Sequence, residues 1–437
     1  MFQTFRNAWK IEELRKRMLF TLLILVLFRL GSAVVVPFVD ASVFAASLAS
    51  EENTITGFFD MMTGGSFSNA TLFALGVTPY INASIILQLL QVVIPSLERL
   101  SKEGEEGQKK MLKITRYVAL GLSASLSVVY YFLVRRNGAL YYSTGIKGWF
   151  SAIVIILSFT AGAMLLMWMG EQIDSDGIGN GISLLIFTGI ISNLFNVFPI
   201  MWQYFRLAAG KVEGYSAQPK YWVIMPLVIL LFVGLFLLII YMDGAERRIP
   251  VQYAKRVVGR KMYGGQSTHI PIKVNCTGVL PIIFAVSILA VPGTIKEFFG
   301  INEGGWATFL GWFNTNNWGY VILYALLILG FNYFYVAIQY NPVEMANNLR
   351  KNSGAIPGIR PGKPTADFIA KVLNKITFIG ALYLIVAADL PIIIEKITGV
   401  TIALGGTSLL IIVGVALEVA QTLDSYMLMR HHKGFLD

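Results

Sequence analysis

The sequence predicts an all-α integral membrane protein with about ten transmembrane helices. The chain has 437 residues, of which 55% are hydrophobic and only 14% are charged, whereas about a quarter of the residues of a soluble protein are charged. The apolar residues also occur in long blocks. Because lipid offers the backbone no hydrogen bonds, each block of about 20 apolar residues is expected to cross the membrane as a helix.

Ten such blocks follow one another along the chain. They lie near residues 18–36, 71–94, 117–134, 150–169, 181–200, 221–242, 274–293, 319–339, 376–394 and 405–427. The first is not expected to be a cleaved signal peptide, because Arg29 interrupts it and many spans follow. Five spans in each of two halves, 18–200 and 221–427, would place related halves in opposite orientations, the inverted-repeat arrangement of many transport proteins.

The basic residues indicate how these spans are oriented. Most of the 35 Lys and Arg fall in the N-terminal amphipathic segment 1–17, in alternate loops and in the tail 428–437. The positive-inside rule places these segments, and therefore both termini, in the cytosol. The net charge of +10 reflects this orientation and does not require a nucleic-acid partner.

Residues that would mark an enzyme, a metal site or an ion-coupled carrier are few. The three histidines have no nearby carboxylate or thiol cluster, and the single Cys276 excludes an internal disulfide. Asp389 and Asp424 fall near span ends, where we expect solvated side chains. Arg29 lies deep in the first predicted span and should make a structural ion pair or helix-end contact. Since no catalytic motif is present, the sequence predicts neither an enzyme nor a cofactor.

One external loop, residues 37–70, contains an apolar stretch at 57–67 that is too short to span the membrane. It is expected either to pack on the bundle as an interfacial loop or to form a re-entrant element that closes a pore. The second arrangement is tolerated at membrane depth only where protein buries it. Gly64 and Gly65 would supply the turn into the second span.

Two long cytosolic loops have features of ordered structure. In 243–273, Ile270, Ile272 and Val274 alternate as one face of a strand would, and Gly264 and Gly265 can turn the chain, so we expect a protruding basic hairpin.

The second of these loops is 340–370. Asn341 and Pro342 are expected to begin a short helix that ends near Gly354, followed by a stiff turn that presents Arg360. Attraction to anionic lipid is one explanation for the charge of both loops, but it requires no ordered turns. Ordered basic projections instead favour docking of a large acidic partner.

The second and seventh predicted spans are unusually polar. Their polar and bending residues include Thr78, Pro79, Asn82, Gln88 and Gln91 in the second and Asn275, Thr277 and Pro281 in the seventh. Amides are unfavourable against lipid, so these faces should contact other helices or water, and the prolines permit bending. The pattern fits a gate or an aqueous lumen, and it also fits ordinary helix packing.

A series of short motifs, in order from the second span to the last, resembles the SecY family of protein-conducting channels. The motifs are 73–81 (FALGVTPYI), 102–105 (KEGE), 170–173 (GEQI), 177–183 (GIGNGIS), 247–250 (RRIP), 253–255 (YAK), 266–269 (QSTH), 278–283 (GVLPII), 357–362 (PGIRPG) and 405–411 (GGTSLLI). Each is weak alone, but together they cover essentially the whole chain.

The resemblance implies two inverted five-helix halves around a central hourglass pore in the bacterial cytoplasmic membrane. Unfolded secretory polypeptides would cross through it, and apolar segments would leave sideways into lipid. It implies a pore ring of Val77, Ile81, Ile182, Ile186, Ile283 and Ile411. An apolar constriction blocks ions by dewetting and offers no specific bonds to a passing chain.

The resemblance also assigns a plug and a lateral gate. The plug would comprise Gly57, Phe58, Phe59, Met61, Met62, Gly64, Gly65 and Phe67. The lateral gate, where signal sequences bind, would include Asn82, Gln88, Asn275, Thr277 and Pro281, with Asn82 and Asn275 as members of a polar contact that holds it shut. Leu126 stands where relatives often carry a polar gate residue, so the full polar cluster is not expected.

The implied partners are the SecA ATPase motor, the ribosome through its rRNA, and small membrane subunits of the SecE and SecG type. Signal peptides, nascent or secretory polypeptides and membrane lipids complete the set. The docking residues for SecA and the ribosome would be Arg247, Arg248, Lys255, Arg256, Arg260, Lys261 and Arg360. A secondary transporter for a small solute and a purely structural assembly subunit are the alternatives, and the ordered motifs disfavour both.

Overall fold

The computed structural model describes residues 2–49, 60, 62–210, 218–253, 256–258, 261–263, 267–299, 304–313, 317–400 and 406–433. Each predicted span contains a helix: α2 (Glu12–Gly31), α5 (Thr78–Val93), α7 (Glu105–Arg136), α8 (Gly145–Asp176), α9 (Gly181–Ala208), α10 (Tyr221–Gly244), α11 (Leu280–Phe299), α13 (Trp318–Gln339), α15 (Lys363–Thr398) and α16 (Gly406–Lys433). Seven of the described helices are long and apolar enough to cross a membrane, or up to eight if α5 and α6 (Pro95–Lys102) form one bent span. The total of ten spans stays a prediction.

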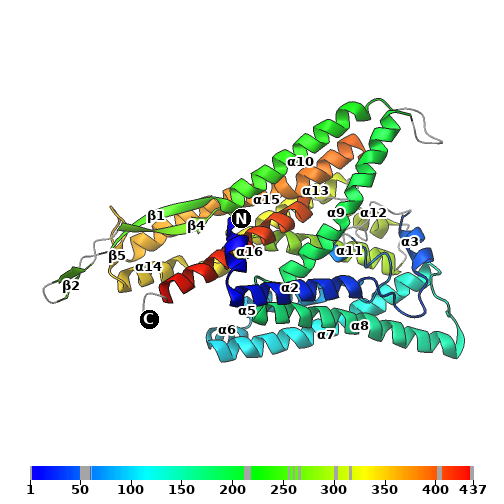
Figure 1. The fold of residues 1–437 in the computed structure, drawn as a ribbon, viewed down its shortest axis with the longest axis horizontal. Coiled ribbons are helices and arrows are strands. Elements are labelled where there is room, and N and C mark those ends of the chain that lie inside the picture. The colour runs from blue at the N-terminus through cyan, green and yellow to red at the C-terminus, as the bar shows by residue number, and fades with distance from the viewer. Residues whose placement is uncertain are drawn as a thin grey trace.

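The helices pack as two sets (Figure 1). In the first set α5 packs on α7, α7 on α8 and α8 on α9, with α2 against α8 and α9. In the second set α11 packs on α13 and α13 on α15, while α10 and α15 pack on α16. The sets meet where α9 contacts α10 and α16, and again where α7 contacts α11. Their inverted relation stays a prediction.

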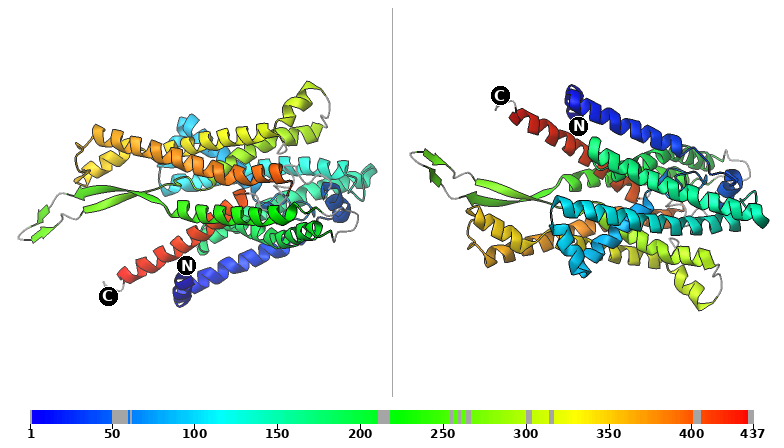
Figure 2. Two further views of the ribbon diagram at one scale, coloured as in Figure 1. Left: turned by 90° about the horizontal axis from the view of Figure 1, so that it is seen from above. Right: turned by 90° about the horizontal axis from the view of Figure 1, so that it is seen from below.

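A β-sheet arm projects from the end of the bundle that carries both chain termini (Figures 1 and 2). Strand β1 (Glu246–Tyr253) pairs antiparallel with β4 (Ser267–Lys273), with Ile249 opposite Ile270. The short strands β2 (Arg256–Val258) and β3 (Lys261–Tyr263) pair with each other at the tip. The predicted hairpin is confirmed, although Gly264 and Gly265 lie outside the described residues.

The 340–370 loop packs against this arm. Helix α14 (Pro342–Lys351) begins as predicted, because the Asn341 side chain accepts hydrogen bonds from the backbone N–H groups of Val343 and Glu344. Strand β5 (Gly354–Ala355) then pairs with β1. An apolar cluster fixes the two loops together, with Ile249, Val251 and Ile272 of the arm and Leu349 and Ile356 of the loop among its buried members. The two projections therefore form one unit.

Three short helices complete the described elements. Helix α1 (Phe2–Trp9) packs on α2 and α16. Helices α3 (Ala41–Ala49) and α12 (Gly305–Gly311) lie at the end of the bundle opposite the arm (Figure 1).

Pro79 and Pro281 were expected to weaken the hydrogen-bond ladder inside their spans and so permit bending, but neither lies in a helix interior. Helices α5 and α11 begin at Thr78 and Leu280, several residues later than predicted, so both prolines lie in a first helical turn. A proline costs little there, because the first N–H groups of a helix have no partner within it. The sharp bend of this region comes later, where α5 and α6 meet at 109° beside Pro95.

Candidate functional site

An apolar cluster, here called the ring cluster, forms where α2, α5, α8, α9 and α16 meet. It brings together five of the six predicted pore-ring residues: Val77, Ile186 and Ile411 are buried members, and Ile81 and Ile182 pack against them. Ile283 of α11 is half-buried and is not among these residues, whereas Val279, one helical turn earlier, packs against the cluster. The chain therefore reaches the ring cluster through Val279, the residue that immediately precedes α11.

The described part of the predicted plug region 57–67, which is Asp60 and residues 62–67, forms a compact turn together with residues 68–70, and we call Asp60 and residues 62–70 the plug segment. Gly64 and Gly65 have φ angles of 68° and 85°, which confirms the predicted turn, since only glycine adopts such angles readily. The backbone N–H of Gly65 donates to the Asp60 carbonyl at 2.9 Å, and that of Ser68 donates to the Asp60 carboxylate at 2.7 Å. Burial raises the pKa of Asp60 above its usual value, and hydrogen bonds with Ser68 offset only part of this increase.

The plug segment packs against the helices around it. Met62 contacts the ring cluster. The Phe67 ring packs edge-on against Tyr130 of α7 with centroids 4.9 Å apart, and the Tyr130 hydroxyl donates to the Phe67 carbonyl. The predicted plug residues Gly57, Phe58, Phe59 and Met61 lie outside the described residues.

Arg29 contacts the plug segment. Its Nη1 lies 3.1 Å from the Gly64 carbonyl oxygen, 3.2 Å from Ser192 Oγ of α9 and 3.4 Å from Ser32 Oγ. The expectation that Arg29 lies deep in its span is wrong, because α2 ends at Gly31 and places Arg29 in the last helical turn. A cation is favoured there by the helix dipole.

The predicted polar contact between Asn82 and Asn275 is not made in this structure. Asn275 Nδ2 donates to Asp243 Oδ1 of α10 at 2.8 Å, and its Oδ1 is buried without a partner among the described residues. Thr277 Oγ1 donates to Asn332 Oδ1 of α13 at 2.6 Å. Both residues therefore fix the start of α11 to its own helix set, because a carboxylate and an amide of that set lie within reach.

A different set of residues joins α5 to the second helix set. The Tyr335 hydroxyl of α13 donates to Gln88 Oε1 of α5 at 3.1 Å. Ile85 of α5 packs with Tyr335 and with Phe284 of α11, and the two aromatic rings stack with centroids 4.8 Å apart. We call Ile85, Gln88, Phe284 and Tyr335 the gate seam. Position 126 of α7 is a half-buried leucine, and its side chain offers no polar group to the gate.

The predicted docking residues lie on the arm and on the loop that packs against it. Arg247, Arg248 and Arg360 are exposed, and Arg248 Nε pairs with the Glu246 carboxylate at 2.6 Å. Arg256 lies in β2 and Lys261 in β3, whereas Lys255 and Arg260 lie outside the described residues.

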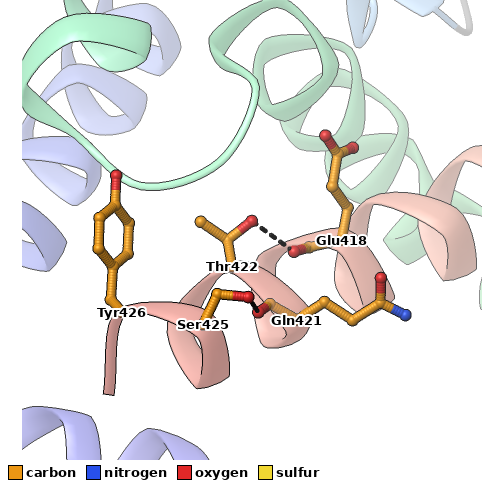
Figure 3. Close-up of a pocket in the computed structure, with 5 residues that line it drawn as sticks. All are labelled: Glu418, Gln421, Thr422, Ser425 and Tyr426. Carbon is orange, nitrogen blue, oxygen red and sulfur yellow. Dashed lines mark hydrogen bonds between the residues drawn. The ribbon is translucent and has the colours of Figure 1, made fainter. Parts of the chain in front are cut away.

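One polar pocket at the arm end of the bundle was not predicted. It has a volume of about 380 Å³ and is lined by Glu418, Gln421, Thr422, Ser425 and Tyr426, all from α16 (Figure 3). Lys273 of the arm donates to Gln421 Oε1 at 3.0 Å, and the Arg17 guanidinium lies 5.6 Å from the centre of the Tyr426 ring. The spacing of three or four residues between these polar side chains was the signal that could have revealed this face.

The remaining ionisable residues of the predicted spans differ in burial. Asp424 is exposed, as expected. Asp389 is only 4% exposed, so the expectation of a solvated side chain is wrong. Helix α15 continues to Thr398 and carries Asp389 inside the packed bundle. Within the described ranges, no group of three or more His, Cys, Asp or Glu side chains could hold a metal ion.

Comparison with known proteins places the chain in a family. The family model SecY matches residues 71–420. The chain is 41% identical to the protein translocase subunit SecY of Thermotoga maritima, covering all of this chain and 98% of the relative. It is 42% identical to the protein translocase subunit SecY of Streptomyces coelicolor, with complete coverage of both.

Solved structures show the same fold. A SecY protein whose plug domain stabilises the closed state of the translocation channel superposes with a TM-score of 0.65 at 20% identity, over 94% of this chain and 91% of that one. Sec61 from the canine ribosome-channel complex superposes with a TM-score of 0.61 at 18% identity and the same coverage. The family match, the full-length relatives and the shared fold together show that this chain belongs to the SecY family.

Proposed function

We propose that the chain is the channel through which unfolded secretory polypeptides cross the bacterial cytoplasmic membrane. The observation that carries this proposal is the packing of Met62, from the plug segment, against the ring cluster formed by Val77, Ile186 and Ile411. A narrow apolar constriction with a removable segment seated on it seals against ions and still lets an extended chain pass. No covalent chemistry is required of the channel itself.

The gate seam is proposed as the route by which apolar segments leave for the lipid. It joins α5 of one helix set to α11 and α13 of the other, mainly through apolar and aromatic contacts and one hydrogen bond between neutral groups. An apolar signal sequence that entered here would replace these contacts with similar ones. Such a ligand favours the open state only through contacts that the closed state lacks.

The arm is proposed as the docking site for cytosolic partners. Arg247 and Arg248 on β1 and Arg360 in the adjoining turn present positive charge on one unit, which suits rRNA or an acidic motor such as SecA. The canine Sec61 relative was solved in a ribosome-channel complex. Small membrane subunits of the SecE and SecG type are expected to cover lipid-facing helices, and both termini are expected in the cytosol.

Photo-crosslinking tests the proposed function. A photoreactive residue at Ile411 should form adducts with a secretory polypeptide arrested halfway across reconstituted membranes, and only when its signal sequence is functional. The matched control is Leu230 of α10, which is 68% exposed on the outside of the bundle. Adducts at Leu230 but none at Ile411 would mean that the chain does not pass this cluster, and the small-solute transporter would then need testing by ion-dependent uptake.

A further inference from the structure

Arg29 joins three parts of the first helix set at one atom. Its Nη1 lies within hydrogen-bond distance of the Gly64 carbonyl of the plug segment and of Ser192 Oγ of α9, while the residue itself belongs to α2. A hydrogen bond from a charged donor is worth more than one from a neutral donor. This guanidinium therefore strengthens a contact that exists only while the plug segment is seated.

The backbone around Gly64 is shaped to bring its carbonyl to this place. Gly64 has a φ of 68°, and a Cβ there would lie 2.6 Å from Ser192 Oγ and 2.9 Å from the Gly189 carbonyl. A Cβ on Gly189 would in turn lie 2.4 Å from the Met62 carbonyl. Two glycines thus allow the plug segment and α9 to approach at backbone distance, and Asn193 Nδ2 adds a 3.4 Å contact to the Asp60 carbonyl.

We propose that Arg29 is a positioning residue that clasps the plug segment onto α2 and α9 and so holds the channel closed. This inference rests on the proposed function, because it assumes that the seated plug segment is the closed state. Its contacts lie within the first helix set, whereas the gate seam connects the two sets. Release of the plug segment must therefore break the Arg29 contacts, and a backbone carbonyl or carboxylate of the passing polypeptide has the chemistry to replace them.

The test measures how often the plug segment leaves its seat. Met62→Cys, in a Cys276→Ser background, places a thiol against the ring cluster, and reconstituted channels are labelled from outside with a membrane-impermeant maleimide. Arg29→Gln should raise the labelling rate about tenfold, the effect expected for one charge-assisted hydrogen bond. The matched control is Arg15→Gln, which removes a charge from the exposed, opposite end of the same helix.

Two further variants keep the test decisive. Ser192→Ala leaves the Arg29 charge in place, removes one of its acceptors and should raise labelling by a smaller factor, so it replaces Arg29→Gln if that variant does not insert. Arg29→Lys keeps the charge and should label more slowly than Arg29→Gln. A purely structural Arg29 predicts lower thermal stability with an unchanged labelling rate.

Equal labelling of Arg29→Gln and Arg15→Gln, or of Ser192→Ala and its parent, would overturn the clasp. The proposed function is judged separately by Ile411→Asn. If this variant conducts ions at rest while the Arg29 variants label like their parents, the clasp is wrong and the channel stands. If Ile411→Asn remains sealed and Ile411 forms no substrate adducts, the proposed function itself fails.

Discussion

Gly189→Ala should unseat the plug segment, because the space for a side chain at this position is filled by backbone. The new Cβ would lie 2.4 Å from the Met62 carbonyl oxygen, about 1 Å closer than an ordinary non-bonded contact. No side-chain rotamer can relieve this contact, so the plug segment or α9 must move. Overpacking of this kind costs about 1–3 kcal/mol, which lowers the seating equilibrium by a factor of about 5 to 150.

The assay is the resting ion conductance of reconstituted channels without substrate, which should rise in Gly189→Ala by a factor in this range. The matched control is Gly121→Ala in α7, where a Cβ would meet nothing within 4 Å. Both substitutions favour the helix by up to about 1 kcal/mol, so the comparison isolates the contact with Met62. If Gly189→Ala and Gly121→Ala channels stay equally sealed, the seat of the plug segment on α9 is not what closes the channel.

Three further predictions concern the gate seam, the plug segment and the arm. Tyr335→Phe keeps the ring stack but removes the hydrogen bond to Gln88, worth about 1 kcal/mol, so the signal-peptide concentration for half-maximal opening should fall severalfold; an unchanged concentration would show that this bond does not hold the gate. Burial raises the pKa of Asp60 in the seated plug segment, so the seated form binds a proton more tightly than the released form. Resting conductance should therefore fall as the outside is acidified toward the ordinary Asp pKa of about 4, and this response should be absent in Asp60→Asn. Asn341→Ala removes the cap of α14 at a cost of about 1 kcal/mol, so hydrogen exchange should quicken severalfold at residues 343–351 while β1 keeps its protection; uniform protection would mean that the cap does not stabilise this helix.

Membrane spans and ordered loops could be predicted from the sequence, because each depends on local chemistry. A long apolar block must form its own backbone hydrogen bonds in lipid, and a helix was found in each of the ten predicted blocks. Asn341 followed by Pro342 predicts a helix start by direct hydrogen bonding, and the structure has it. Alternation at Ile270 and Ile272 likewise predicted the strand that became β4.

Helix boundaries and the partners of polar side chains were decided by tertiary structure. Apolar residues continue past the ends of helices. The predicted spans therefore ran beyond Gly31, where α2 ends, and began before Thr78, where α5 starts. As a result, Arg29 lies in the last turn of α2 and Pro79 in the first turn of α5, and neither lies in the interior of its helix. Asn275 could bind any acceptor at the same depth, and only the packing of α10 beside α11 selects Asp243.

The sequence by itself determined that the chain crosses a membrane and which family it resembles, whereas the orientation of its spans stays a prediction of the positive-inside rule. The tertiary structure decided which residues meet. It gathered Val77, which immediately precedes α5, with Ile186 of α9 and Ile411 of α16 into one cluster and seated Met62 against them. It also brought Gly64 and Arg29, 35 residues apart, within 3.1 Å. Such contacts depend on how whole helices pack, and packing sums many weak interactions that no local pattern encodes.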